Sequence, residues 1–234
     1  MTDLIFSGGA RVRPLTIIRS PRAKQMRLRV DQRNGAVRLT LPRRAGLAHA
    51  LAWVQTKRSW IEGQLAGLPV LQPITPVMAF SFCGDRVTLD WAAQYPRTPQ
   101  RIGDQLRIGG PLEMLDARLQ RWLKREAKVL FTRETFEFAA KIGVSIASVG
   151  IGDPVSRWGS CATSGAIRYS WRLILAPAFV RRATIAHEVA HRIHMNHGPE
   201  FHALVKALFG EDPGGARAWL RCNGAALHGF GRLS

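Results

Sequence analysis

The chain has 234 residues, 46% of them apolar, which is enough for one large or two small domains with a buried core. Its 34 lysines and arginines against 16 acidic residues give a net charge of +18 and an isoelectric point near 11.5, so polyanions are natural partners. The three cysteines are scattered, which argues against a disulfide scaffold. The sequence has no apolar run near the roughly 18 residues of a membrane span, which argues against a membrane enzyme. It also has no signal-peptide pattern, so we expect a cytoplasmic protein.

Residues 1–110 are predicted to form a strand-rich, basic N-terminal region with one helix. Alternating or short apolar runs predict its strands, at residues 12–18, 26–30, 36–41, 80–91 (a hairpin) and 106–108. Asn34-Gly35 is a hairpin signal between two of these strands. A helical pattern covers residues 47–65, and Gly109-Gly110-Pro111 ends the region, so we place a domain boundary there.

Basic side chains are concentrated in this N-terminal region. Arg27 and Arg29 alternate with apolar residues, which places both arginines on one face of a strand. With Arg22 and Lys24 they form a candidate polyanion-binding surface for nucleic acid or a nucleotide. The alternative is a solvated sheet face without a binding role.

Residues 111–234 are predicted to begin with the longest helix of the chain, at 112–142, because apolar residues recur there at helical spacing. Short strands are expected next, at residues 144–151, 155–158 and 166–171. Pro177 starts a further helix that should end near Asn196, since Gly198-Pro199 follows. Shorter helices are expected last, at residues 201–208 and 216–223. This mixture of elements predicts an α+β fold.

The helix after Pro177 contains the sequence His187-Glu188-Val189-Ala190-His191. Histidines four residues apart share one helix face, so both imidazoles can bind one metal ion. Zn²⁺ with imidazole ligands and one open position lowers the pKa of bound water to roughly 7. Glu188 can accept a proton from that water as the water attacks a carbonyl, which is the arrangement of zinc peptidases. Beside the motif, Ile185, Val189 and Ile193 predict a buried stripe.

The third metal ligand has several candidates in the sequence. His197 lies ten residues after His187, the third-ligand distance of the metzincin pattern, in which a glycine three residues after the second histidine makes the turn. Here that position holds His194, which tolerates an unusual backbone angle better than a β-branched residue would. His197 is therefore the predicted ligand, while His194, His202 and Glu200 are alternatives.

Three segments carry a resemblance to a known family: Ser156-Arg157-Trp158-Gly159-Ser160-Cys161, the stretch from Ile167 to Pro177, and Met195-Asn196-His197-Gly198-Pro199-Glu200-Phe201. With the His-Glu-x-x-His motif they resemble the bacterial YgjP-like family of metal-dependent hydrolases, relatives of the SprT-like zinc metallopeptidases. The resemblance implies a zincin-like metallopeptidase domain after the strand-rich region, with zinc on His187, His191 and His197 and Glu188 as the catalytic carboxylate. His202 departs from the family, because an aromatic residue, usually Trp, is expected after Phe201.

The favoured function is zinc-dependent hydrolysis of a peptide or protein substrate, with Glu188 activating the zinc-bound water. Arg157 and Tyr169 are candidates for stabilising the oxyanion. One alternative is a metal-dependent hydrolase of nucleoside triphosphates, of the pyrophosphatase type, in which the arginine excess holds phosphates. The other is a nucleic-acid-associated protein with a secondary metal site. The oligomeric state does not follow from the sequence.

Overall fold

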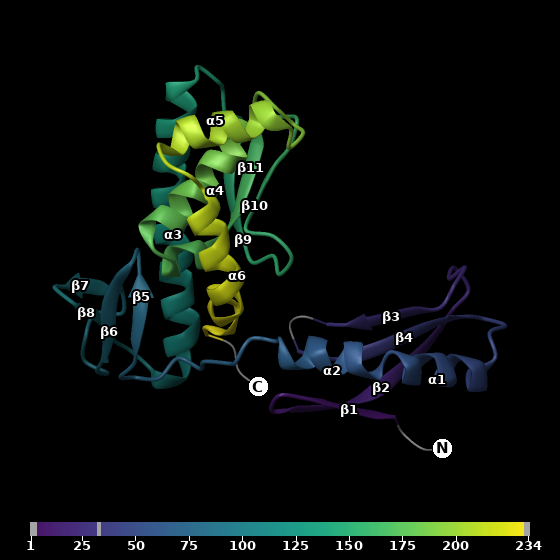
Figure 1. The fold of residues 1–234 in the computed structure, drawn as a ribbon. Helices are drawn as coiled ribbons and strands as arrows, with labels where there is room; N and C mark the ends of the chain where they lie inside the picture. The colour runs from purple at the N-terminus through teal and green to yellow at the C-terminus, as the bar shows by residue number, and fades with distance from the viewer. Residues whose placement is uncertain (1–3, 32–33, 232–234) are drawn as a thin grey trace. The chain divides into compact units, whose positions relative to one another are not determined.

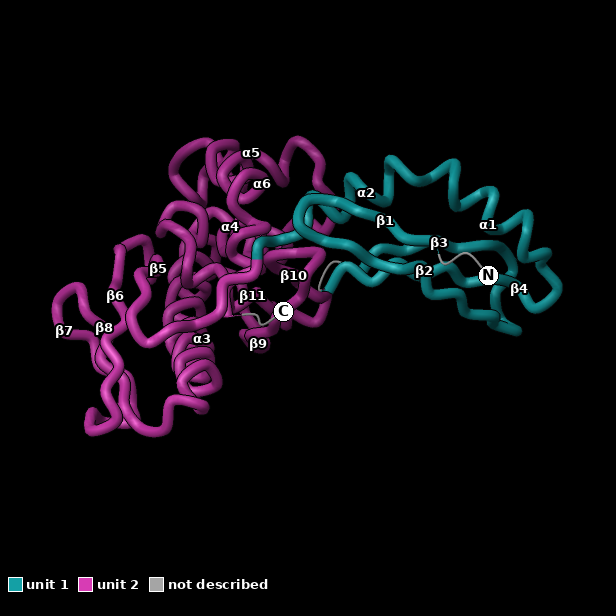
Figure 2. The backbone as a smooth tube through the Cα atoms, turned by 90° about the horizontal axis from the view of Figure 1, so that it is seen from below, with its two compact units in different colours: residues 1–70, 234 teal, residues 71–233 magenta. Residues whose placement is uncertain are grey.

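The computed structural model describes residues 4–31 and 34–231, which form an α+β fold. Contacts divide the chain between Val70 and Leu71 into two units, coloured separately in Figure 2. This division lies earlier than the expected boundary near residue 110. Strands between residues 79 and 108 belong with the second unit because their apolar residues share its core; they include Phe80, Val87, Leu89 and Leu106.

The first unit is a four-stranded sheet covered by two helices. Its strands are β1 (Ile5–Gly8), β2 (Arg11–Ser20), β3 (Arg27–Val30) and β4 (Val37–Pro42), in the order β1-β2-β4-β3 with β2 and β4 parallel. The predicted single helix over 47–65 is interrupted at Lys57, which gives α1 (Leu47–Thr56) and α2 (Arg58–Ala66). Leu39, Val54 and Ile61 are fully buried between the sheet and these helices.

The predicted alternation in β3 is confirmed by burial. Val30 is buried while Arg27 and Arg29 are exposed, and Arg29 lies opposite Arg38 of β4 on the same face. Arg22 and Lys24 are also exposed. The sheet therefore presents several cations on the face that the helices leave open.

The second unit begins with another four-stranded sheet, formed by β5 (Ala79–Phe82), β6 (Asp85–Trp91), β7 (Gln100–Ile102) and β8 (Gln105–Ile108). Its order, β5-β6-β8-β7 with a parallel central pair, repeats the topology of the first sheet. A turn of 3-10 helix, η1 (Leu112–Met114), then leads into α3 (Leu115–Lys141), close to the expected span.

The remaining strands form a three-stranded sheet with the order β10-β11-β9. β9 (Ser148–Gly152) and β11 (Ala166–Ser170) overlap expected strands, whereas β10 (Gly159–Cys161) lies just after the expected strand at 155–158. β10 pairs only with β11 within the described part of the chain, so it is an edge strand.

The last elements of the second unit are helical: η2 (Trp171–Leu175), α4 (Ala178–Ala190), α5 (Pro199–Phe209) and α6 (Gly214–Gly229). α4 contacts α3, α5, α6 and β10, and Figure 1 shows it surrounded by these elements. α6 is longer than the expected helix at 216–223. No helix in the described ranges is long and apolar enough to cross a bilayer.

Candidate metal centre

α4 is held in place by its apolar stripe and by one buried ion pair. Ile185 and Val189 are fully buried, as the spacing predicts. Near the start of the helix, the Arg181 guanidinium donates two hydrogen bonds to Glu134 of α3, at 2.9 and 2.8 Å. A planar guanidinium bound at both oxygens restricts rotation of its partner. The position of α4 against α3 is thereby fixed at its N-terminal end.

The end of α4 differs from the prediction. The helix stops at Ala190, well before Asn196, and the backbone N–H groups of Ile193 and His194 both bond to the Ala190 carbonyl. Ile193 is consequently 48% exposed and does not continue the buried stripe. No left-handed backbone is needed at His194, because among the described non-glycine residues only Cys83 has a positive φ angle.

The early end of α4 allows three histidines to converge. His187 lies on the helix, His191 is its C-cap, and His197 comes from the connection to α5. One ligand nitrogen of each lies within 4.8 Å of the others, and Nε2 of His187 is 3.2 Å from Nε2 of His197. The structure thus brings together the three residues that the sequence predicts as metal ligands.

Phe201 packs against all three imidazoles and was not predicted as part of the site. Its ring centroid lies 4.9 Å from that of His187, 4.6 Å from His191 and 4.7 Å from His197. Only 1% of this side chain is exposed, so it cannot move aside easily. The helical spacing of Phe201 predicts core packing, and contact with the histidines follows only from the return of α5.

A backbone hydrogen bond orients His191. Its Nδ1 lies 3.0 Å from the carbonyl oxygen of His194. A carbonyl can only accept, so Nδ1 carries the proton and Nε2 keeps a free lone pair. Metal-binding histidines are commonly held by such a second hydrogen bond. The turn after α4 therefore sets the tautomer that a metal ligand requires.

The alternative ligands lie outside this group. His194 Nδ1 is 3.8 Å from Oε2 of Glu200, whose side chain is 86% exposed. His202 lies in α5, with its ring centroid 6.4 Å from that of His197. Within the described residues, the histidine triad includes none of these three side chains.

Burial makes the imidazoles suitable for a metal. Burial, together with the nearby His191 and His197, lowers the pKa of His187 to about 4. Burial likewise lowers the pKa of His191. A histidine must be neutral to bind a metal, so both shifts favour the form that binds. Three convergent imidazole nitrogens without a carboxylate are a donor set that fits zinc.

Glu188 is enclosed beside the triad. It is 5% exposed, and burial raises its pKa to about 7, against a lowering influence from Arg157. Strand β10 passes so close that a β-carbon placed on Gly159 would lie 2.4 Å from Oε1 of Glu188. Any side chain at this point of the strand would therefore force Glu188 or β10 to shift. Sequence reasoning did not identify Gly159 as part of the site.

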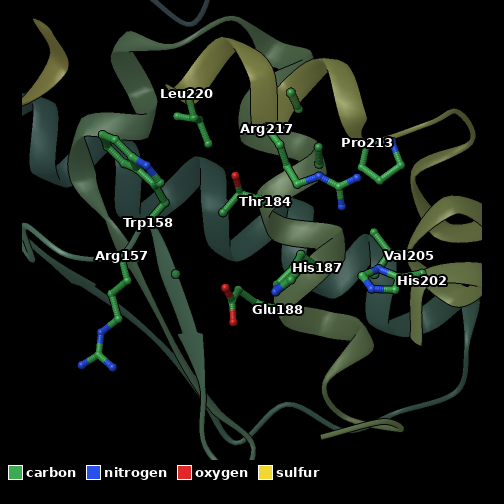
Figure 3. A pocket seen from close by; sticks show the side chains of 13 residues that line it. Arg157, Trp158, Thr184, His187, Glu188, His202, Val205, Pro213, Arg217 and Leu220 are labelled. Atoms are coloured by element: carbon green, nitrogen blue, oxygen red, sulfur yellow. The ribbon is translucent and has the colours of Figure 1, made fainter. Parts of the chain in front are cut away.

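A cavity of about 280 Å³ opens next to Glu188 and His187. Figure 3 shows both side chains at one end of it, with Trp158 and Leu220 toward the other. Its walls are mainly apolar, with cationic or polar groups from a few residues; the lining comprises Arg157, Trp158, Gly159, Ala183, Thr184, His187, Glu188, His202, Val205, Pro213, Ala216, Arg217 and Leu220. Such a cavity can hold an apolar group of a molecule whose reacting atoms lie at the triad.

The two candidate oxyanion stabilisers occupy different surroundings. Arg157 is exposed on the cavity wall, and in Figure 3 its guanidinium points away from Glu188. Tyr169 is 1% exposed, and its hydroxyl lies 3.1 Å from that of Thr135. Burial raises the pKa of Tyr169 above its ordinary value. Of the two, only Arg157 borders the cavity.

Comparison with known families matches residues 24–223 to a family described as YgjP-like, metallopeptidase domain. The matched segment includes most of the first unit as well as the histidine triad. No curated protein and no solved structure matches the chain.

Proposed function

The chain belongs to the YgjP-like metallopeptidase family, and from that membership we propose that it is a zinc-dependent peptidase with a zincin-like active site. The observation that carries the proposal is the convergence of three histidine nitrogens within 4.8 Å of one another, beside a buried glutamate. His187, His191 and His197 would hold the ion. Bound zinc supplies Lewis acidity, which polarises a carbonyl and makes water more acidic.

Glu188 is proposed as the general base. It follows His187 directly on α4, so its carboxylate lies beside the ligands without belonging to the triad. Its burial against Gly159 holds the carboxylate in one place and excludes bulk water from one side. A general base fixed within reach of the attacking water contributes typically 10²–10⁴-fold, as an order of magnitude. The proton taken from water then passes to the amine that leaves.

The substrate is proposed to be an extended peptide lying along β10. This strand is the edge of its sheet within the described residues, and it contacts α4. Backbone groups of an edge strand can pair with an added peptide strand. Gly159 places β10 directly beside Glu188, so a peptide bond held there meets the base. The apolar cavity then receives a neighbouring side chain of the peptide.

The positive charges around the cavity affect which substrate side chains it can accept. Arg157 and Arg217 line it, whereas Glu188 is the only acidic residue among its described lining residues. A lysine or arginine side chain would be repelled by this local charge. We therefore propose large apolar residues, and not basic ones, as the occupants.

The nucleotide alternative receives less support. Phosphoanhydride hydrolases use magnesium, which prefers carboxylate oxygens. In the described part of the chain, the only cluster of metal-binding side chains is the all-histidine triad. Softer imidazole donors favour zinc.

Incubation of the zinc-loaded protein with casein, a nucleoside triphosphate and DNA tests the proposal. We expect zinc-dependent cleavage of casein, lost in Glu188→Gln. If only the triphosphate is hydrolysed, and Glu188→Gln abolishes this activity, the protein is a phosphoanhydride hydrolase and not a peptidase.

A further inference from the structure

A second hollow lies in the same unit, over the first half of α3, and shares no lining residue with the metal centre. Its volume is about 420 Å³, within the roughly 300–1,000 Å³ of typical ligand sites. Four of its eight lining residues are arginines, and none is acidic: Arg97, Thr98, Pro99, Met114, Arg118, Arg121, Trp122 and Arg125.

Helix geometry explains why the arginines meet. Arg118, Arg121 and Arg125 follow one another at intervals of three and four residues on α3, so they share one face. Arg97 joins them from the connection between β6 and β7. The sequence of α3 alone suggests a solvated basic face, and only the approach of the Arg97 loop encloses it.

The base of the hollow is ordered by close packing. Arg118 donates a hydrogen bond of 2.6 Å to the Gly109 carbonyl. Gly110 has a φ of 87°, and a β-carbon there would lie 3.0 Å from Nη2 of Arg118 and 3.2 Å from Cγ of Arg97. Trp122, 8% exposed and 5.0 Å from the Phe82 ring, lines the hollow beside them.

The charges of this cluster are poorly balanced. Among the described residues, Arg97 and Arg121 have no carboxylate partner, and Arg125 has only a 3.4 Å pair with Glu126 at the surface. Like charges three and four residues apart destabilise a helix. Cations near a helix N-terminus also oppose its dipole, and Arg118 lies in the first turn of α3. An anion in the hollow would offset both costs.

We propose that these four arginines bind the phosphate groups of a polyanionic ligand. Guanidinium groups bind phosphate through two parallel hydrogen bonds. Four guanidinium groups carry more positive charge than a single carboxylate would neutralise, which favours a ligand with several phosphate charges. The phosphates can belong to a compact polyphosphate or to a single-stranded nucleic acid. Such a ligand would sit on the enzyme apart from the histidine triad.

Binding is tested with two probes, inorganic tripolyphosphate and a fluorescent single-stranded RNA, on the full-length zinc-loaded protein. The test variant is Arg121→Gln/Arg125→Gln, since both side chains are exposed and neither anchors the hollow. The control, Arg133→Gln/Arg221→Gln, removes the same charge from exposed positions of the same unit outside the hollow. Circular dichroism and zinc content verify that both variants fold.

We expect at least tenfold weaker binding of a probe in the test variant and less than twofold in the control. For RNA, the slope of log affinity against log salt should also fall by about 0.7 for each phosphate that the variant no longer neutralises. If tripolyphosphate binds more weakly to the test variant than to the control, the ligand is a compact polyphosphate. If only RNA binding shows this difference, the ligand is the backbone of a nucleic acid. Binding of neither probe, or equal weakening in both variants, overturns the proposal.

Discussion

Gly159 of β10 and Glu188 of α4 are in such close contact that a β-carbon on the glycine would lie 2.4 Å from Oε1 and 2.7 Å from Cδ of the glutamate. Something must therefore shift if any side chain is added. The contact connects the edge strand that we propose for substrate binding to the residue that we propose as the base.

Gly159→Ala is the direct test of this contact. The added methyl group displaces the carboxylate or moves β10 away, and either change separates base from substrate. We expect kcat/KM for casein to fall at least tenfold with zinc content unchanged, and overpacking to cost about 1–3 kcal/mol of stability. Gly215→Ala, where a β-carbon meets no atom within 4 Å, is the control. Full activity in Gly159→Ala would show that the contact does not position Glu188.

Glu188→Gln separates catalysis from metal binding. The amide keeps the shape of the carboxylate but cannot accept a proton from water. Casein cleavage should fall by about 10²–10⁴-fold, the usual contribution of a general base. Elemental analysis should still give about one zinc per chain. If zinc disappears together with activity, Glu188 has a structural role in the metal site.

His197→Ala should lower zinc affinity much more than His194→Ala or His202→Ala. Its Nε2 is 3.2 Å from that of His187, while the other two side chains lie outside the triad. We expect a loss above ~100-fold, since removal of a supporting hydrogen bond alone costs about 10–100-fold. Competitive titration with a chelator measures all three variants. The reverse ranking would mean that His194 or His202 supplies the third ligand.

Leu220 should influence the residues that flank the cleaved bond, because it lines the cavity beside Glu188. Leu220→Trp narrows the cavity and should shift cleavage toward small residues, whereas Leu220→Ala should favour larger ones. Mass spectrometry of casein fragments reads this preference. Leu130→Ala, a partly buried leucine outside the cavity, is the control. An unchanged fragment pattern from an active Leu220 variant would exclude the cavity from substrate selection without affecting the assignment of Glu188.

Arg27→Glu/Arg29→Glu tests the basic sheet face of the first unit. Both side chains are exposed on β3, so their reversal should leave folding and zinc content unchanged. Binding of single-stranded DNA should weaken and lose part of its salt dependence, because fewer counterions are released. Arg43→Glu/Arg44→Glu changes the charge equally at exposed positions outside β3. If the DNA-binding isotherm is the same for the wild type and both variants, this face has no binding role and contributes only to solubility.

Local patterns were sufficient for much of the fold. The stripe of α4, the long α3 and the alternation in β3 all follow from the repeat distances of helices and strands, which depend only on neighbouring residues. The pairing of His187 with His191 follows for the same reason. Local patterns also placed Arg27 and Arg29 on one exposed face.

The end of α4 and the place of His197 required the tertiary structure. A helix continuing past Ala190 would favour His194, whereas packing of α5 returns His197 and Phe201 to the imidazoles. The division at Val70, the contact of Gly159 with Glu188 and the enclosure of the α3 arginines likewise join segments distant in sequence. Such contacts leave no repeating pattern in the sequence, because they depend on how whole elements pack around a shared core.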